Sequence, residues 1–163
     1  MLMALAQSLS ETGLHAWIQT QPWLWPVLEI SHFIGLTLLI GGLIVVDFRV
    51  LGFGAGSQGE DSLQSAYQLL SLVLAGFALN LITGVLFCFG DPFRYAANIG
   101  FRWKMFLIFV AGVNALYHHW RLSPTVAGEE SLSTEARISA ALSLCLWTAV
   151  ILLGRLIPYV GTG

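Results

Sequence analysis

Residues 22–46 read PWLWPVLEISHFIGLTLLIGGLIVV and carry only two ionisable side chains, Glu29 and His32. About 20 consecutive apolar residues are enough for a helix to cross the hydrocarbon core of a bilayer. The stretch therefore predicts a membrane-spanning helix with an imidazole at bilayer depth. Ionisable side chains inside membrane spans are costly and usually mark a function, so His32 is the first candidate functional residue.

The composition of the whole chain agrees with a membrane protein. Of its 163 residues, 56% are hydrophobic and 10% are charged, whereas soluble domains carry about 25% charged residues. We expect a single transmembrane domain over residues 1–163. The net charge of −2 and the lack of a basic run argue against a nucleic-acid partner. Cys88 and Cys145 lie in separate apolar stretches without a CxxC motif, which predicts buried free thiols.

Three further apolar stretches are long enough to cross a bilayer, at about 65–89, 101–120 and 134–157. The turn sequence Gly90-Asp91-Pro92 ends the first of these three stretches, and Pro158 ends the last. Together with the span at about 22–46 they predict an all-α fold, an integral membrane four-helix bundle.

The segments outside the spans predict simpler structures. Residues at about 3–19 suit a short interfacial helix with Leu14, Trp17 and Ile18 facing lipid. No Lys or Arg precedes this apolar segment, so we do not expect a cleaved signal peptide. The Gly-rich stretch 51–59 lacks the Lys of a phosphate-binding loop and predicts a flexible connector.

We call the membrane side on which the first span begins side A and the opposite side side B. Trp23 and Trp103 then fall at side A and Trp120 at side B, as expected for interfacial aromatic residues. The Lys and Arg residues are almost equally divided between the two sides. Only the cluster around residues 94–104 favours a cytoplasmic side A.

Histidines inside the spans are the candidate ligands for a metal or a haem. His32 is followed at i+3 by Gly35, and a glycine on the same helix face leaves room for a flat macrocycle. His118 shares its helix face with Asn114, one turn earlier, which could orient the imidazole. His119 points about 100° away from His118. The alternative is that these histidines only form hydrogen bonds between helices and that Gly35 serves close packing.

The depths of the two main histidines bear on how many cofactors are bound. With Trp23 and Trp103 at one interface, His32 lies about 13 Å deep and His118 about 22 Å deep. This difference of about 9 Å favours two sites, or a second ligand from elsewhere, over one shared iron. Met105 is a substitute ligand to consider. His15 lies outside the spans and is expected at the interface.

Charged and small residues in the spans suggest further roles. Glu29 and Arg155 both belong to the side-A half, where an ion pair would offset their desolvation. Arg155, Arg102 or Lys104 could instead neutralise a haem propionate. Asp47 and Arg49 are expected as solvated residues at the side-B boundary. The row of Gly76, Asn80 and Gly84 predicts a close-packing seam on the second span, with Asn80 hydrogen-bonded across it.

Four segments, at 26–35, 47–52, 75–84 and 101–118, resemble an uncharacterised family of small four-helix bacterial membrane proteins. The match extends from Trp23 to about Arg121. This architecture is similar to that of b-type membrane cytochromes, including hydrogenase cytochrome b subunits and superoxide oxidase, and of copper-resistance D proteins. The resemblance implies haem binding and a multi-pass protein of the bacterial inner membrane. The family positions are Glu29, His32, Lys104, Asn114 and His118.

The sequence thus leads us to expect a b-type cytochrome with one or two haem b groups per chain. It would transfer electrons with a quinone or a redox protein, and an enzymatic form would be a quinone-linked oxidoreductase. Its cofactor site would draw on His32, Gly35, Lys104, Asn114, His118, His119 and Arg155. The alternatives are a copper-binding or copper-transport protein that uses His15, His118 and His119, and a structural subunit of a membrane complex. Association into a homo-oligomer stays open.

Overall fold

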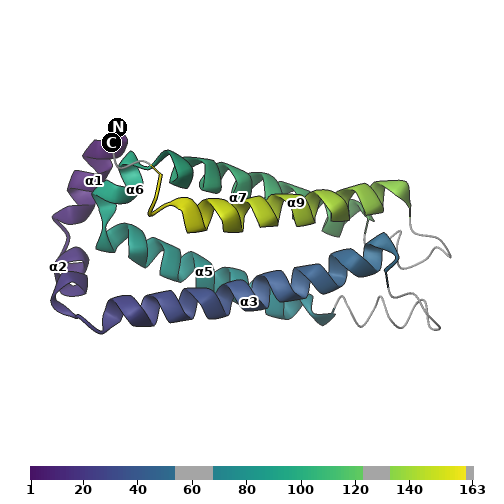
Figure 1. The fold of residues 1–163 in the computed structure, drawn as a ribbon, viewed down its shortest axis with the longest axis horizontal. Helices are drawn as coiled ribbons and strands as arrows, with labels where there is room; N and C mark the ends of the chain where they lie inside the picture. The colour runs from purple at the N-terminus through teal and green to yellow at the C-terminus, as the bar shows by residue number, and fades with distance from the viewer. Residues whose placement is uncertain (54–67, 123–132, 161–163) are drawn as a thin grey trace.

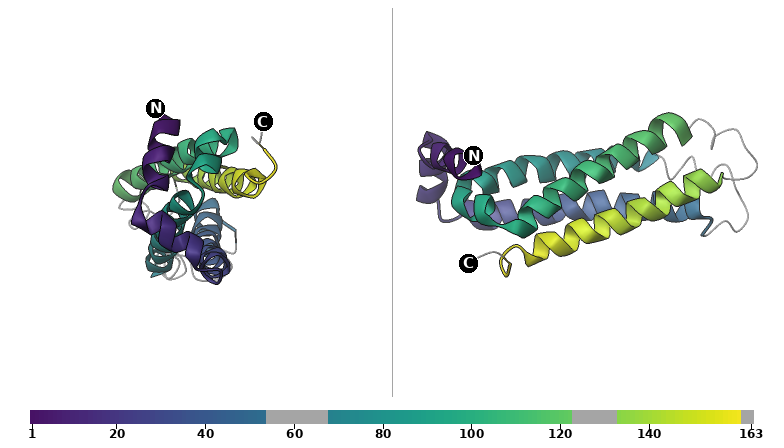
Figure 2. Two further views of the ribbon diagram at one scale, coloured as in Figure 1. Left: turned by 90° about the vertical axis from the view of Figure 1, so that its left-hand side faces the viewer. Right: turned by 90° about the horizontal axis from the view of Figure 1, so that it is seen from above.

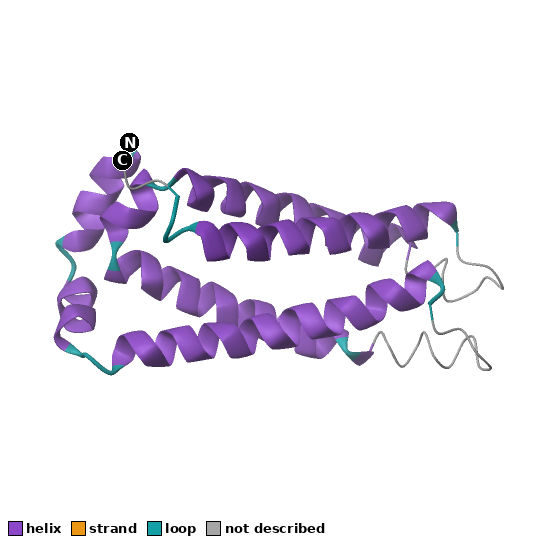
Figure 3. Cartoon of the chain, in the orientation of Figure 1, coloured by secondary structure: helices purple, strands orange, loops and turns teal. Residues whose placement is uncertain are grey.

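Four long helices lie lengthwise beside one another in the computed structural model, which describes residues 1–53, 68–122 and 133–160 (Figure 1). They are α3 (Leu24–Leu51), α5 (Leu70–Gly90), α7 (Ile99–Tyr117) and α9 (Thr134–Leu156). Each is long and apolar enough to cross a membrane. The described part of the chain contains helices and no strand (Figure 3). This confirms the prediction of an all-α multi-pass membrane protein.

Three short helices lie at one end of the bundle, which is side A (Figures 1 and 2). They are α1 (Leu2–Ser10), α2 (Gly13–Thr20) and α6 (Pro92–Ala97). The predicted interfacial helix over 3–19 is therefore two helices. The break occurs because the Thr12 hydroxyl accepts a hydrogen bond from the amide of His15, 3.2 Å away, and starts a new helix.

Helix α2 is fastened to the end of α5. The imidazole Nδ1 of His15 lies 2.7 Å from the carbonyl oxygen of Phe89 and donates to it, because a carbonyl can only accept. Gln19 donates to the carbonyl of Gly90 at 2.5 Å. These two carbonyls belong to the last turn of α5, which has no intrahelical partner for them. Ile18 is buried against Leu28, so the prediction that Ile18 faces lipid is wrong.

The end of α3 differs most from the sequence prediction. The helix does not end at residue 46 but continues through Asp47 and Arg49 to Leu51, where Gly52 adopts φ +93° and terminates it. Most of the Gly-rich connector predicted at 51–59 lies outside the described residues, as does the predicted start of the second span at residue 65.

Glycines bring α3 and α5 close together. A methyl group added to Gly76 would lie 2.6 Å from the carbonyl oxygen of Gly35, so the two backbones meet there. The Asn80 amide donates within α5 to the Gly76 carbonyl at 3.0 Å. Gly84 has no atom within 4 Å of its added methyl group. The predicted seam is therefore confirmed at Gly76 and does not extend to Gly84. Asn80 packs against Gly35 of α3, but its hydrogen bond stays within α5, so the predicted bond across the seam is wrong.

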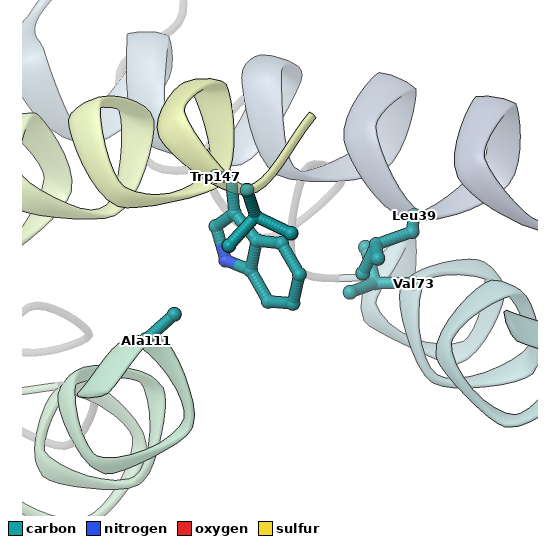
Figure 4. Packing of buried hydrophobic residues seen from close by; sticks show 5 residues of the cluster. Leu39, Val73, Ala111 and Trp147 are labelled. Atoms are coloured by element: carbon teal, nitrogen blue, oxygen red, sulfur yellow. The ribbon is translucent and has the colours of Figure 1, made fainter. Parts of the chain in front are cut away.

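A tryptophan fills the middle of the bundle. Trp147 of α9 packs with Leu39, Val73, Ala111 and Val150, so this cluster draws on all four long helices (Figure 4). Leu39 lies near the midpoint of α3. The Trp147 cluster therefore separates the interior of the side-A half from the interior of the side-B half.

The outer surface of the bundle is apolar. Each long helix exposes at least one large hydrophobic side chain by more than 60%, namely Phe33, Leu74, Phe109 and Ile138. Such side chains would be unfavourable in water over so much contiguous surface and are favourable in lipid. The surface thus agrees with the lengths of the four spans.

Candidate functional site

His32 is held in one orientation by a hydroxyl group of the neighbouring helix. Its Nδ1 lies 2.7 Å from Oγ1 of Thr83 on α5. The Thr83 hydroxyl also lies within hydrogen-bond distance of two backbone carbonyls, those of Leu79 at 2.8 Å and Asn80 at 3.2 Å. When its proton goes to one of these carbonyls, it accepts from Nδ1–H of His32, and Nε2 of His32 then carries the lone pair.

Lys104 reaches the same region from the other side of the bundle. It belongs to α7 and acts electrostatically on His32 of α3. Its ammonium group also lies against α9, because a methyl group on Gly154 would be 3.2 Å from Nζ. The ring of Phe87 meets the imidazole of His32 with centroids 5.5 Å apart. The side-A interior therefore combines an oriented imidazole with a cationic side chain.

Gly35 faces α5 rather than an open space beside His32. A methyl group on Gly35 would lie 2.8 Å from Nδ2 of Asn80. The structure therefore supports the close-packing role that the sequence left as the alternative for this glycine.

His118 is held by the same kind of contact at the other end of the bundle. Its Nδ1 lies 3.3 Å from Oγ of Ser139 on α9. The Ser139 hydroxyl donates to Oδ1 of Asn114 at 3.1 Å, and the Asn114 amide donates back to the Ser139 carbonyl at 3.1 Å. Ser139 therefore accepts from Nδ1–H of His118. Asn114 orients the imidazole as predicted, but through Ser139.

The backbone changes form at His118. Helix α7 ends at Tyr117, and a π-helical segment, η1 (His118–Leu122), continues it. Short π segments are rare and frequently occur at functional sites. His119, the first residue after His118, is exposed, as expected from its direction on the helix.

A cavity of about 70 Å³ borders His118 in the side-B half. Its polar lining comes from Asp47, Asn114, His118, His119, Ser139 and Ser143. Asp47 is only 5% exposed, and its Oδ2 is buried without a hydrogen-bond partner. The prediction that Asp47 is a solvated boundary residue is therefore wrong. The apolar run that continues to Leu51 was the sequence signal for its burial.

The structure places His32 and His118 at opposite ends of the interior. Asp47, which borders the same cavity as His118, follows His32 by 15 positions, or about 22 Å along α3. The two imidazoles are thus farther apart than the sequence estimate, and they cannot ligate one iron. Across the described ranges, no three His, Cys, Asp or Glu side chains are grouped to hold a metal ion.

The other charged candidates lie near the side-A surface. Arg155 is exposed and donates to the hydroxyl of Tyr159 at 3.3 Å, while Glu29 accepts from the indole of Trp25 at 3.1 Å. The predicted ion pair between Glu29 and Arg155 is therefore wrong, because each group finds a partner on its own helix or the following turn. Met105 is 46% exposed, away from both histidines.

The remaining predictions at this end have mixed outcomes. Arg102 is exposed, so of the three proposed propionate partners only Lys104 lies in the interior. Both cysteines are free thiols, as predicted, but Cys88 is only half-buried and Cys145 is exposed on the bundle surface, so the prediction that they are buried is wrong. Tyr95 lies on α6, outside the spans, and burial raises its pKa to about 12.

No protein-family model, curated protein or solved structure matches this chain.

Proposed function

We propose that the chain is a membrane-embedded b-type cytochrome that transfers electrons with a quinone or a redox protein. The observation that carries this proposal is the 2.7 Å contact between Nδ1 of His32 and the Thr83 hydroxyl in the side-A half of the bundle, which fixes the orientation of the imidazole. Haem iron is commonly ligated by an imidazole whose other nitrogen donates to a neighbouring group.

The donors at side A suit a haem in two respects. His32 offers a nitrogen ligand in a fixed orientation, and Lys104 offers a cationic partner for a propionate. A bound haem would supply the one-electron redox chemistry. His32 would hold the iron, Thr83 would keep the imidazole ring from rotating, and Phe87 would exclude water from one side of the ring.

The cavity at side B suits a haem less well than side A does, because Asp47 in its lining is an acid and haem propionates are anionic. The haem proposal therefore rests on His32 and the side-A half.

The position of His32 also agrees with exchange of electrons near one membrane surface. It follows the start of α3 at Leu24 by eight positions, about 12 Å along the helix. A quinone in the bilayer or a redox protein docked at side A could approach a cofactor at this depth. A quinone and a redox protein are therefore the two alternative electron-transfer partners in this proposal.

Absorption spectra of the purified protein, expressed with sufficient haem, test the proposal. We expect a Soret band, sharp α and β bands on reduction, and a pyridine haemochrome signal. His32→Ala should abolish all three signals, while His119→Ala, an exposed histidine at the other end, should keep them. A colourless wild-type protein, or a His32→Ala variant with full haem content, would refute the proposal.

A further inference from the structure

An acidic side chain lies buried in the side-B half of the bundle. Asp47 of α3 is 5% exposed, and its Oδ2 has no hydrogen-bond partner. The residue borders the side-B cavity, and no Lys or Arg is among the described residues that line this cavity. Burying an ionised carboxylate is very costly unless it is paired or coordinates a metal ion, and buried polar atoms of native proteins almost always have a partner. The carboxyl group of Asp47 therefore calls for a ligand.

The same cavity is bordered by further oxygen donors. Asn114 of α7 and both Ser139 and Ser143 of α9 line it together with Asp47. Hydroxyl and amide oxygens each have two acceptor lone pairs, so the hydrogen bond from Ser139 to Asn114 leaves acceptor capacity on the Asn114 oxygen. A carboxylate with neutral oxygen donors on neighbouring helices is a ligand set that suits hard cations.

The charge of the cavity favours a monovalent ion over a divalent one. Asp47 is the only acid among the described residues that line the cavity. A cation with one positive charge would form a neutral pair with this carboxylate. A divalent cation would leave an excess positive charge inside the span, where a net charge is costly.

The cavity has room for an ion and can be reached from side B. Its volume of about 70 Å³ is several times the roughly 10–15 Å³ that one water molecule requires in a cavity, so an ion could enter together with water. His119 borders the cavity and is itself exposed, which places the entrance near the side-B end of α7. Buried acids that line cavities of membrane proteins commonly mark ion pathways.

We propose that the side-B cavity binds an alkali-metal cation on the carboxylate of Asp47. Oδ2 of Asp47 is the charged ligand, and the oxygens of Asn114, Ser139 and Ser143 are neutral ligands, directly or through water molecules. The proposal assigns no ligand role to the histidines of the cavity. Cation binding goes beyond the proposed electron transfer and is independent of the haem proposed at His32.

Sodium binding to the full-length protein in detergent tests the site. Equilibrium dialysis with radioactive Na⁺ should load one ion per chain. Asp47→Asn should weaken Na⁺ binding by more than about 30-fold, the lower end for removing one partner of a buried charge pair. Glu29→Gln makes the same acid-to-amide change at an exposed position at the far end and should bind Na⁺ like the wild type.

Thermal unfolding at constant ionic strength separates a ligand role from a folding defect. Replacing choline by Na⁺ should raise the unfolding temperature of the wild type and of Glu29→Gln but not that of Asp47→Asn, because only a protein that binds the ion is stabilised by it. In choline, Asp47→Asn should be at least as stable as the wild type, since an amide leaves no unbalanced charge. Ser143→Ala keeps the acid and should weaken Na⁺ binding by about 2–10-fold, as the loss of one neutral polar contact does.

Three results would overturn the proposal. A wild-type unfolding temperature that is the same in Na⁺ and in choline would show that a proton, not a metal cation, neutralises Asp47. Equal Na⁺ binding by Asp47→Asn would exclude the carboxylate as the ligand, and displacement of Na⁺ by an equal concentration of Ca²⁺ would contradict a monovalent site. Failure of the cytochrome proposal is distinguishable, because His32→Ala should lose haem and keep Na⁺, whereas Asp47→Asn should lose Na⁺ and keep haem.

Discussion

The two ends of the bundle interior orient a histidine in the same way but place opposite charges beside it. At side A, Nδ1 of His32 donates to Thr83, and Lys104 lies close by. At side B, Nδ1 of His118 donates to Ser139, and Asp47 shares the cavity. The similarity lies in how a hydroxyl group of a neighbouring helix orients each ring, and the difference lies in the ionisable group beside it. A cationic neighbour favours a cofactor with anionic groups, as proposed at side A.

The layer between the two ends should have the largest effect on stability. Trp147→Ala would leave a cavity among Leu39, Val73, Ala111 and Val150. We expect the free energy of unfolding to fall by about 3–5 kcal/mol, as for other Trp→Ala changes in cores. Reversible unfolding in mixed micelles would measure this loss. A loss below about 1 kcal/mol would show that the two halves do not depend on this layer, since even small core deletions typically cost that much.

A pair of matched variants tests whether the Thr83 hydroxyl acts locally. Thr83→Val should weaken haem binding by about 10–100-fold, because outer-shell partners of metal-ligating histidines contribute this much. Ser139→Ala, which removes the hydroxyl beside the other histidine, should leave haem binding unaffected. Haem titration of both proteins checks this, and an equal loss in both would contradict a local role of Thr83.

The contact between α3 and α5 gives a prediction restricted to side A. Gly76→Ala would force a methyl group against the Gly35 carbonyl, 2.6 Å away, and should cost about 1–3 kcal/mol of stability as overpacking does. It should also disturb the alignment of His32 with Thr83 and so lower haem occupancy. Gly84→Ala, on the same helix with open space around it, is the matched control and should be nearly neutral.

The smallest expected effect concerns Tyr95 and alkaline pH. Burial raises the pKa of its phenol to about 12, above the value of about 10 in an unfolded chain. Between these values the folded protein keeps a proton that the unfolded chain has lost, so stability falls as the pH rises from about 10 to 12. Tyr95→Phe should lessen this fall. Ultraviolet titration of the folded wild type should show one tyrosine that ionises at a higher pH than the others.

Much of the fold could be predicted from the sequence because lipid imposes a simple rule on it. Long apolar stretches must form helices to satisfy their backbone groups, and the stretches ended by Asp91-Pro92 and Pro158 do so close to the predicted ends. The same reasoning wrongly predicted that Asp47 is solvated, because a charged residue near the end of an apolar stretch resembles a residue at the membrane boundary. Its surroundings include Ser139 and Ser143 of another helix, which border the same cavity and which no local sequence pattern links to Asp47.

The environment of each histidine was the least predictable part. Thr83 and Ser139 lie 51 and 21 positions from the histidines that they orient, and no local spacing links them. The roles of these hydroxyl groups follow from which helices are neighbours and how they are rotated. Local signals were more informative where the partner was close, as for Asn114 and His118.

The contacts of α2 with the last carbonyls of α5 also bear on the order in which the chain assembles. His15 and Gln19 bind a backbone segment that is synthesised some seventy residues later and reaches side A only after crossing the membrane twice. Helix α2 can therefore bind the end of α5 only after the second crossing of the membrane is complete. Its docking marks the moment when the first helical hairpin has been fully inserted.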